Sequence, residues 1–428
     1  MTTLIPKYQL ATTDVNRPYN EKIGETISVK DFGAVGDGVA DDTTALANAR
    51  AYLAALSAAN TQLPTLLFPA GIYKYSVSPN WAINKISLQT EGEVRMRYTG
   101  TGNAFIIDGA GQSMYGLYFS RFIIEAPATA GHGVYIRVVQ HSTFDFQVNG
   151  CGSTSAGIYV AFSVCSVFNS PKVSVNDGGW YLNAKPYYGL YLTNYVVGAD
   201  NGDCSFCTFI NPIIEGTQQG IVCNSALGNT FIGGTSEAIT DTAIVIQANG
   251  RYNKFFTIDL EANAGDVICA GHDNEFYGIN SQLYFQISAA GYNNLVVGGT
   301  FDTFFIDTGS EDNTVTAIKY NTQNTGSYSD NGTRTRARDL YNYQTNLHHN
   351  SLPTQIIVGA GASPYTYTNT TGNNIMINVV GGTVTTLGIT RNAVTNFIGY
   401  VNGSVMVCPN DSLVITHTGA PTLVFLNQ

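Results

Sequence analysis

The sequence is poor in charged residues, which make up 12% of its 428 positions against roughly 25% in an average globular domain. The few charges are acidic on balance, with a formal net charge of −10 and no basic stripe. That balance argues against nucleic acid or an anionic membrane as a partner. No apolar run reaches the ~18 residues that a membrane span requires. Hydrophobic residues still make up 44% of the chain, which is too many for a disordered protein.

Paired metal-binding cysteines and a signal peptide are also missing. The seven cysteines are an odd number, and the single CxxC, Cys204 to Cys207, has neither a second CxxC nor a nearby histidine pair. The N-terminal MTTLIPKYQLATTDVNRPYNEK lacks the features of a signal peptide. We therefore expect buried free thiols, no metal, no cofactor and synthesis in a reducing cytosol.

Helical periodicity is nearly absent, and a strand phrase of the form small–apolar–x–apolar recurs in its place. Within each copy the two apolar residues stand two apart, which is the period of a strand. Stacked copies predict an inward ladder of apolar pairs. The copies are AFII at 104–107, GVYI at 133–136, GIYV at 157–160, GLYL at 189–192, GIVC at 220–223, AIVI at 243–246 and DVIC at 266–269.

A second phrase lies out of phase with the first and aligns without gaps. Its copies are CTFINPIIE, NTFIGGTSE, NKFFTIDLE, NEFYGINSQ and NLVVGGTFD, which begin at residues 207, 229, 253, 274 and 294. The asparagine that heads most copies suits either a left-handed turn position or a stack of amides bonded from coil to coil. Two strand phrases in about 20–24 residues, with no helix between them, predict an all-β fold: a right-handed parallel β-helix, or solenoid.

One amphipathic helix is expected, directly after Asp42. Leu46, Ala49 and Leu53 would form its apolar face and lie across the first coil, because a solenoid must cover its open end. Asp42 suits the position that begins a helix. Asp37, Asp41 and Asp42 are therefore interpreted as turn and helix-start carboxylates without a catalytic role.

Three stretches carry a family resemblance. VKDFGAVGDGVADDTTALANA followed by LLFPAGIY resembles the N-terminal signature of the pectate-lyase-like β-helix superfamily. VNRPYNEKIGETISVKDFGA resembles the neck of phage tailspike and tail-fibre depolymerases, and residues 363–428 resemble the small β domain that closes several tailspikes. The resemblance implies a homotrimer in the virion tail that binds, and usually cleaves, a bacterial capsular or O-antigen polysaccharide. It also implies attachment to a tail or baseplate adaptor through the N-terminus, either by a short anchor or by a head-binding domain that precedes this chain.

The domain organisation that we expect has five parts. They are a neck at 1–26, a cap helix with the first coils at 27–102, the parallel β-helix at 103–318, an extended inter-subunit linker at 319–354, and a small antiparallel β domain at 355–428. The last part would serve trimerisation or glycan binding, with trimerisation favoured.

Carboxylates repeat at the ninth position of the second phrase, as Glu215, Glu237, Glu261 and Asp302, with Gln282 in the fourth copy. Equivalent residues of successive coils lie ~4.8 Å apart. Glu237 and Glu261 would thus fall near the ~5–5.5 Å of a retaining glycosidase, and alternate coils near the ~9.5 Å limit of an inverting one. Stacked like charges should raise one pKa, as a general acid requires. Asp259 would share their face. The alternative is that these carboxylates are solvated or bond the backbone of a turn.

The candidate substrate-binding residues come from an insertion and from nearby cations. Trp180, Tyr181, Tyr187 and Tyr188 lie in a long insertion that could form a glycan platform, while Tyr191 could be core. Arg251 and Lys254 could neutralise the carboxylates or hold an acidic sugar. GHG at 131–133 resembles a polygalacturonase motif, but that family's other motifs do not follow in order, so we interpret His132 as a turn residue.

These features favour a tailspike depolymerase that hydrolyses a surface polysaccharide with paired carboxylates. A polysaccharide lyase or a deacetylase on the same scaffold remains an alternative, as does a receptor-binding fibre that holds glycan without cutting it. A lyase would need a Tyr, His, Lys or Arg base beside a uronic acid, and no spacing in the sequence selects one.

Overall fold

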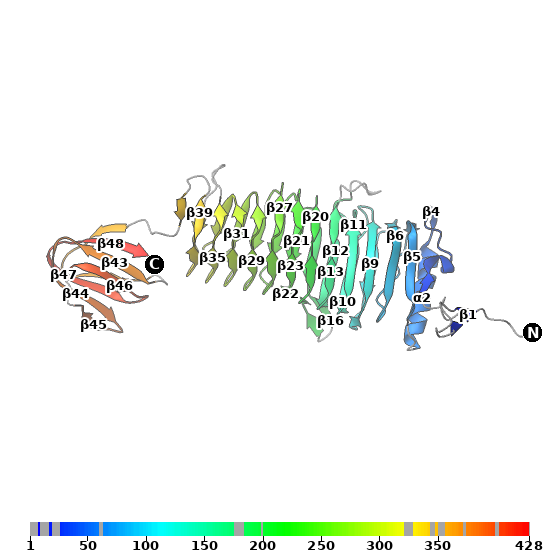
Figure 1. Cartoon of the computed structure of the whole chain (residues 1–428), viewed down its shortest axis with the longest axis horizontal. Coiled ribbons are helices and arrows are strands. Elements are labelled where there is room, and N and C mark those ends of the chain that lie inside the picture. Colours follow the sequence, from blue (N-terminus) through cyan, green and yellow to red (C-terminus); the bar gives the residue numbers. More distant parts are fainter. Residues whose placement is uncertain are drawn as a thin grey trace, which may run out of the picture.

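The computed structural model describes most of the chain as a row of stacked coils followed by a separate C-terminal domain (Figure 1). None of the helices that it describes is long and apolar enough to cross a membrane. The described residues are 7–8, 17–18, 26–59, 63–174, 184–197, 200–320, 328–342, 347–349, 356–370, 374–398 and 402–427.

Two parallel sheets form the walls of the coils. Sheet I consists mainly of β7 (Phe105–Asp108), β10 (Val134–Gln140), β12 (Ala156–Val164), β15 (Tyr188–Thr193), β21 (Gln219–Cys223), β25 (Thr242–Ile246), β28 (Val267–Cys269), β31 (Tyr284–Ile287), β34 (Thr303–Ile306) and β37 (Tyr328–Asp330). Three short strands line its corners. β8 (Met114–Tyr115) pairs with β10, while β18 (Cys204–Ser205) and β22 (Ala226–Leu227) continue the column after β12 and are followed by isolated bridge residues.

Sheet II is bent, so that each later coil contributes two short strands to it. Its first strands are β3 (Thr26–Ser28), β4 (Asp37–Asp41), β5 (Thr65–Tyr75), β6 (Ser87–Tyr98), β9 (Tyr118–Glu125) and β11 (Thr143–Val148). The later pairs are β13 (Val167–Asn169) with β14 (Lys172–Ser174), β19 (Thr208–Ile210) with β20 (Ile213–Glu215), β23 (Thr230–Ile232) with β24 (Thr235–Glu237), β26 (Lys254–Phe256) with β27 (Asp259–Glu261), β29 (Glu275–Tyr277) with β30 (Asn280–Ser281), β32 (Leu295–Val297) with β33 (Thr300–Phe301), β35 (Thr314–Thr316) with β36 (Lys319–Tyr320), and β38 (Arg336–Arg338) with β39 (Leu340–Asn342).

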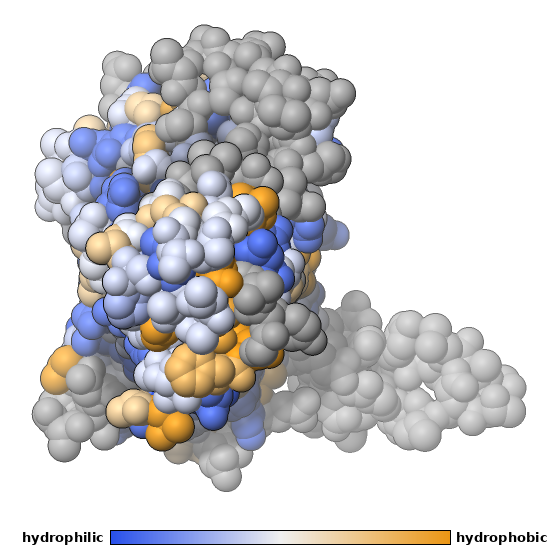
Figure 2. Space-filling model, turned by 90° about the vertical axis from the view of Figure 1, so that its left-hand side faces the viewer, coloured by the Kyte–Doolittle hydropathy of each residue, from blue (hydrophilic) through white to orange (hydrophobic). Residues whose placement is uncertain are grey.

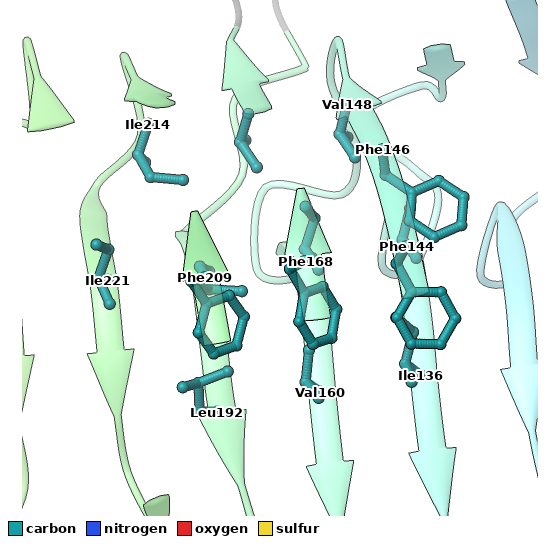
Figure 3. Close-up of a cluster of buried hydrophobic side chains, with 14 of the residues drawn as sticks. Ile136, Phe144, Phe146, Val148, Val160, Phe168, Leu192, Phe209, Ile214 and Ile221 are labelled. Atoms are coloured by element: carbon teal, nitrogen blue, oxygen red, sulfur yellow. The ribbon is translucent and has the colours of Figure 1, made fainter. Parts of the chain in front are cut away.

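The predicted right-handed parallel β-helix is confirmed, and so is its inward ladder. Val134 pairs with Phe105 and with Ile158, and the same register continues through Leu190 and Ile221. These side chains are fully buried because alternate residues of each strand point to the same side. Figure 3 shows Ile136, Val160 and Leu192 of sheet I pointing toward the phenylalanines of sheet II. Cys223 and Cys269 occupy this ladder, and five of the seven free thiols are buried while Cys165 is exposed.

Phenylalanine rings stack from coil to coil on the inner face of sheet II. Phe209, Phe231 and Phe255 are in register, with ring centroids 4.8 and 4.5 Å apart and planes within 10°. The strand spacing of about 4.8 Å matches the distance at which parallel rings pack. Each ring therefore fixes the register of the next coil.

The asparagines that head the second phrase form a ladder of amides. In Asn274, the side-chain amide donates to the Gly250 carbonyl oxygen and to the Asn294 amide oxygen at 3.1 and 3.2 Å. Its own amide oxygen accepts from the backbone and side-chain nitrogens of Asn253 at 3.0 and 3.1 Å. Of the two interpretations left open by the sequence, the coil-to-coil stack is correct. The left-handed residue is the one before each asparagine, such as Tyr252 or Asp273.

The expected cap helix is α2 (Thr43–Ala58), which follows the short 3-10 helix η1 (Val29–Phe32). It buries Ala45, Leu46, Ala49 and Leu53 against the first coils. The acidic trio is structural, as predicted, but Asp42 does not cap the helix. Its carboxylate accepts from the backbone nitrogens of Val35 and Gly36 at 2.6 and 3.2 Å and so closes the preceding turn. Asp41 accepts from the Thr43 nitrogen at 2.9 Å instead.

The coils continue beyond residue 318, where an extended linker was expected. Lys319 of β36 pairs with Thr300 and with Tyr341, and β38 pairs in parallel with β35. Arg336 and Arg338 of β38 point outward, while Ala337 between them packs against the core. The alternation of outward arginines with an inward alanine is enough to pack this last coil, because the end of the coils needs few apolar residues. β39 then pairs antiparallel with β40 (Leu347–His349).

The C-terminal domain has its own core, formed between two four-stranded antiparallel sheets. One sheet contains β41 (Ile356–Gly359), β48 (Thr422–Asn427), β43 (Ile375–Val380) and β46 (Gly403–Val407); the other contains β42 (Tyr365–Thr368), β47 (Ser412–Gly419), β44 (Thr383–Arg391) and β45 (Val394–Phe397). Figure 2 views this end of the molecule, and its surface mixes hydrophilic residues with scattered apolar ones. Val394 and Phe397 are among the exposed apolar residues of this domain. Two further strand pairs are β1 (Lys7–Tyr8) with β2 (Arg17–Pro18), and β16 (Tyr195–Val197) with β17 (Asp200–Gly202).

The amide ladder predicts a large and specific loss of stability on substitution. Asn274→Ala removes the acceptor of two buried Asn253 donors and the donor to Gly250, and each buried polar group left unpaired costs about 1–3 kcal/mol. We therefore expect a loss of roughly 3 kcal/mol or more, measured by urea unfolding. The exposed Asn280→Ala on β30 is the matched control and should lose little. Equal losses in both variants would contradict a stabilising ladder.

Candidate active site

The three glutamates of the predicted carboxylate ladder end successive strands of sheet II. Glu215 of β20 pairs with Glu237 of β24, and Glu237 pairs with Glu261 of β27. Their inward neighbours Ile214 and Leu260 are fully buried, so the glutamates lie on the outer face. The predicted vertical alignment is confirmed. Neighbouring members are separated by one coil, about 4.8 Å along the axis.

The ladder members differ in their surroundings. Glu215 Oε2 accepts a hydrogen bond from Ser174 Oγ at 2.6 Å, and Glu215 and Glu237 are half-buried. Glu261 is exposed, and its pKa is raised above the usual value. The main cause is a hydrogen bond to the Asp259 carboxyl on the same strand, followed by the charge of Asp259, with Glu237 contributing last. The predicted rise of one pKa is thus present, but the neighbour along the strand causes most of it.

Asp302 lies outside this group. It follows β33, two coils beyond Glu261, and the uncharged Gln282 lies between them in the column. Its pKa is raised by partial burial and by the charge of Asp266. Asp266 is fully buried, accepts from Ser281 Oγ and from the Leu283 nitrogen at 2.8 Å, and also has a raised pKa because of its burial. Asp302 therefore interacts with Asp266 and not with the glutamates of the ladder.

The two candidate cations are paired with acids outside the ladder. Arg251 Nη2 lies 2.9 Å from Asp203 Oδ2, and Lys254 Nζ lies 3.1 Å from Glu275 Oε1. Both precede or begin β26, whereas the glutamates end β20, β24 and β27. Sequence proximity suggested that these cations could neutralise the carboxylates, but the cations precede the bend in sheet II and the glutamates follow it.

The aromatic candidates divide into described and undescribed residues. Trp180 and Tyr181 lie outside the described residues. Tyr187 and Tyr188 contact each other edge to face, with ring centroids 4.6 Å apart, and Tyr188 contacts Tyr191 at 4.5 Å. Tyr191 is not a core residue, because the inward positions of β15 belong to its buried neighbours Leu190 and Leu192.

A row of tyrosines on the outer face of sheet I extends from this group. Tyr135, Tyr159 and Tyr191 are in register on β10, β12 and β15, with centroids 5.1 and 5.7 Å apart. Burial raises the pKa of Tyr159 to about 12, so its hydroxyl remains a hydrogen-bond donor. His132 stacks on Tyr159 at 4.5 Å, and its Nδ1 accepts from the Ala156 nitrogen. Sequence reasoning missed Tyr135 and Tyr159, although both occupy the x position of the strand phrase, as in GVYI and GIYV.

The tyrosine row and the carboxylate ladder meet at one corner of the coil. Tyr188 at the start of β15 pairs with Gln219, which follows Glu215 by four residues. Ser174 pairs with Glu215 on the other side of the same corner. A chain lying over this corner would contact Tyr187 and Tyr188 on sheet I and the glutamates on sheet II. Its hydroxyl groups would meet carboxylates and phenols within one stretch of surface.

The side chains at this corner offer proton donors, proton acceptors and aromatic rings. Within the part of the chain that the structure describes, no three His, Cys, Asp or Glu side chains are grouped so as to hold a metal ion. Two neighbouring carboxyl groups, one with a raised pKa, fit general acid–base or nucleophilic chemistry at a glycosidic bond.

Comparison with known proteins supports the fold assignment. Residues 26–120 match the family described as "Rhamnogalacturonase A/epimerase, pectate lyase-like". No curated protein sequence matches closely enough to count as a relative. The matched segment contains η1, α2 and the first coils. It includes the signature DFGAVGDG, residues 31–38, which begins in η1.

Solved structures of similar shape come from phages and from a bacterial enzyme. The gp42 tailspike of Acinetobacter phage vb_AbaP_AS12 has a TM-score of 0.52 at 12% identity, over 89% of this chain and 81% of that chain. The enzymatically active domain of tailspike protein 2 of bacteriophage CBA120 has 0.47 at 12% identity, over 96% and 71%. The mannuronan C-5 epimerase A-module of Azotobacter vinelandii has 0.43 at 16% identity, over 73% and 97%.

The chain thus has a right-handed parallel β-helix fold, and its residues 26–120 are similar to the pectate-lyase-like family named above. The chain has a helix-capped N-terminal end and a small antiparallel β domain after the coils, and the gp42 tailspike, at 12% identity, is similar to it in fold.

The carboxyl pair predicts a pH-dependent gain in stability for Asp259→Asn. The folded state raises the pKa of Glu261, so it holds a proton there more readily than the unfolded chain does. Folding is consequently opposed at pH values where both carboxyls are ionised, and this opposition disappears as the pH falls through the raised pKa. We expect Asp259→Asn to melt at a higher temperature than the wild type at neutral pH.

In acid the two proteins should melt together. Asp145→Asn, which removes a carboxylate bonded to Arg121 elsewhere on sheet II, serves as the control and should show no such gain at neutral pH. A gain for Asp259→Asn that persists in acid would exclude repulsion between Asp259 and Glu261 as its cause.

Proposed function

We propose that the protein is a phage tailspike that binds a bacterial surface polysaccharide, capsular or O-antigen, and depolymerises it by hydrolysis. The observation that carries this proposal is the register of Glu237 and Glu261 on adjacent strands, together with the raised pKa of Glu261. A general acid must hold its proton at the working pH, whereas its partner must be ionised.

In the proposed mechanism Glu261 protonates the leaving oxygen of the glycosidic bond. The carboxyl of Asp259, hydrogen-bonded to Glu261, helps to retain that proton before the reaction. Glu237, one coil away, attacks the anomeric carbon as the leaving oxygen departs, and a water that gives its proton to the Glu261 carboxylate then cleaves the glycosyl ester and frees Glu237. The spacing of one coil is close to the separation of carboxyl groups in retaining enzymes, and Glu215, two coils from Glu261, offers the longer separation of inverting ones.

The tyrosines at the same corner would hold the sugar chain. Rings in the row cover one another's faces, so Tyr135 and Tyr159 present edges and hydroxyl groups. Tyr188 and Tyr187, at the end of the row nearest the glutamates, are tilted by 40° and 65° from their neighbours. Such rings can pack against the apolar face of a sugar while the hydroxyls of the row bond its oxygens.

Elimination is less well supported than hydrolysis. A lyase requires a base beside a uronic acid. Burial raises the pKa of Tyr188, which opposes its deprotonation, and the cations Arg251 and Lys254 are already paired with Asp203 and Glu275. A deacetylase or a fibre that binds without cutting would leave the chain length of the polysaccharide unchanged.

The same proposal assigns roles to the N-terminal residues, the C-terminal domain and the segment between the coils and that domain. Residues 1–26 would form the neck toward the tail or baseplate adaptor, and the working assembly would be a homotrimer in the virion tail. The C-terminal domain, expected from residue 355, would hold three chains together. The segment expected as a linker, 319–354, would then supply the last coil of the β-helix, up to Asn342, before it leads to that domain.

The test follows the products from a panel of purified capsular and O-antigen polysaccharides. New reducing ends without the ultraviolet absorbance of unsaturated uronates indicate hydrolysis, and both signals together indicate a lyase.

Glu237→Gln and Glu261→Gln should each lower hydrolysis by about a hundredfold or more, since an acid–base residue contributes at least that factor. Glu311→Gln, an exposed acid paired with Arg334, is the matched control and should retain activity. Full activity in both ladder variants would remove the glutamates from the mechanism, and constant chain length would leave binding or deacetylation.

A further inference from the structure

A second corner of the coil contains a continuous column of left-handed residues. From His141 to Asp312, each residue of this corner column donates its backbone N–H to a carbonyl of the next coil, as Phe206 does to Leu227 and Tyr252 does to His272. The φ angles lie between 49° and 66°. The column consists of His141, Cys165, Phe206, Gly228, Tyr252, Asp273, Asn293, Asp312 and Arg334.

Two members of the corner column, Phe206 and Tyr252, are bulky aromatic residues with left-handed backbone geometry. Gly, Asn, Asp and His accept left-handed backbone geometry, but a bulky aromatic residue is an outlier there. Arg334 has a visible reason for its place, since it bonds Glu311 and Asp312. Phe206 and Tyr252 have no comparable reason: their side chains are 57% and 50% exposed. Strained backbone that presents an exposed ring indicates a function outside the chain.

Local packing holds these exposed rings in place. The Phe206 ring lies over Gly228, where an added Cβ would come within 2.7 Å of its Cε1 atom. Two coils further along, the edge of the Tyr252 ring contacts His272 at 6.0 Å, and His272 stacks on Tyr292 at 4.5 Å and 8°. Tyr292 is 46% exposed. We call Phe206, Tyr252, His272 and Tyr292 the aromatic ridge; it runs parallel to the axis of the coils.

Polar groups flank the aromatic ridge along its length. Arg251 lies in the column of bridges between Leu227 and His272 and bonds Asp203, whose other oxygen accepts from Ser225 Oγ at 2.6 Å. Asp273 accepts from Asn293 and lies 2.7 Å from His272 Nδ1. Exposed rings therefore stand beside hydrogen-bonding groups that other side chains already hold in position.

We propose that the aromatic ridge is a second carbohydrate-binding site, which anchors the polysaccharide away from the point of cleavage. This inference rests on the proposed function. A sugar ring has an apolar face bordered by hydroxyl groups, which fits a ring bordered by Arg251, Asp203 and Asn293. The spacing of the coils, about 4.8 Å, is comparable to the length of one pyranose along a chain. A protein interface would require a broader apolar area.

The ridge and the carboxylate ladder flank opposite ends of the strand pair β26–β27. Tyr252 directly precedes the buried Asn253 and strand β26, whereas Glu261 ends β27 after the bend in sheet II. A long chain could thus be held at the ridge while another part of it is cut. A short oligosaccharide bound at the glutamates would not reach the ridge.

The experiment measures binding in a Glu237→Gln/Glu261→Gln background, so that the probe is not cut. The probes are purified capsular and O-antigen polysaccharides, alginate and rhamnogalacturonan, and affinity electrophoresis selects those that retard the protein. Calorimetry then compares Phe206→Ala and Tyr252→Asn with their parent. We expect each to weaken binding of the long polysaccharide by about tenfold, as loss of an anchoring ring does. Tyr252→Asn should also raise the melting temperature, because asparagine suits the left-handed backbone.

Tyr118→Ala, which removes a 45% exposed tyrosine on β9, is the matched control and should bind like the parent. In the active background, the ridge variants should cleave short oligosaccharides at the wild-type rate. Unchanged affinity in both ridge variants would overturn the second site and leave the proposed hydrolysis intact. Weakened binding of a polysaccharide that is never cut would support the site and reject the hydrolysis. A change in oligomeric state, measured by light scattering, or no binding by any probe, would overturn the inference.

Discussion

Parallel hydrogen bonding between successive coils fixes the vertical position of every residue in this protein. Because the strands pair at a constant spacing, residues about twenty positions apart in sequence become neighbours along the axis. The interior uses this constraint to stack like on like: rings on Phe231 and Phe255, and amides on Asn253 and Asn274. Each stack satisfies the packing or hydrogen-bonding needs of its members only while the register is kept.

The same constraint brings together acidic side chains on the outer surface, although these side chains repel one another. Glu237 and Glu261 are in register because their strands pair, with the buried Ser236 and Leu260 of the same strands paired just before them, so the core determines the separation of the carboxylates. The raised pKa of Glu261 comes mainly from Asp259 on the same strand, with Glu237 contributing last. A solenoid can thus hold neighbouring carboxylates on an open face, since the core supplies the energy that fixes the backbone.

Corners are where coils of this protein differ from one another. The left-handed corner before β26 carries Gly228, Tyr252 or Asp273 at equivalent positions, because the backbone bonds of that corner do not involve the side chain. Side chains there differ in size and polarity, and a bulky one is held at the cost of backbone strain. The tyrosine row ends at one corner and the aromatic ridge follows another, so both candidate glycan surfaces border the regular sheets.

The sequence by itself determined the β-helix, the inward pairs such as Ile158 and Val160, the cap helix and the alignment of Glu215 with Glu237, because each follows from a repeat whose period equals one coil. It could not locate Arg251 and Lys254 relative to the glutamates, since the bend within sheet II separates residues that are close in sequence. Nor could it show that Asp259, and not a stacked glutamate, raises the pKa of Glu261, or that Tyr191 faces outward. Those outcomes depend on side-chain direction and hydrogen bonding at corners, which only the tertiary structure decides.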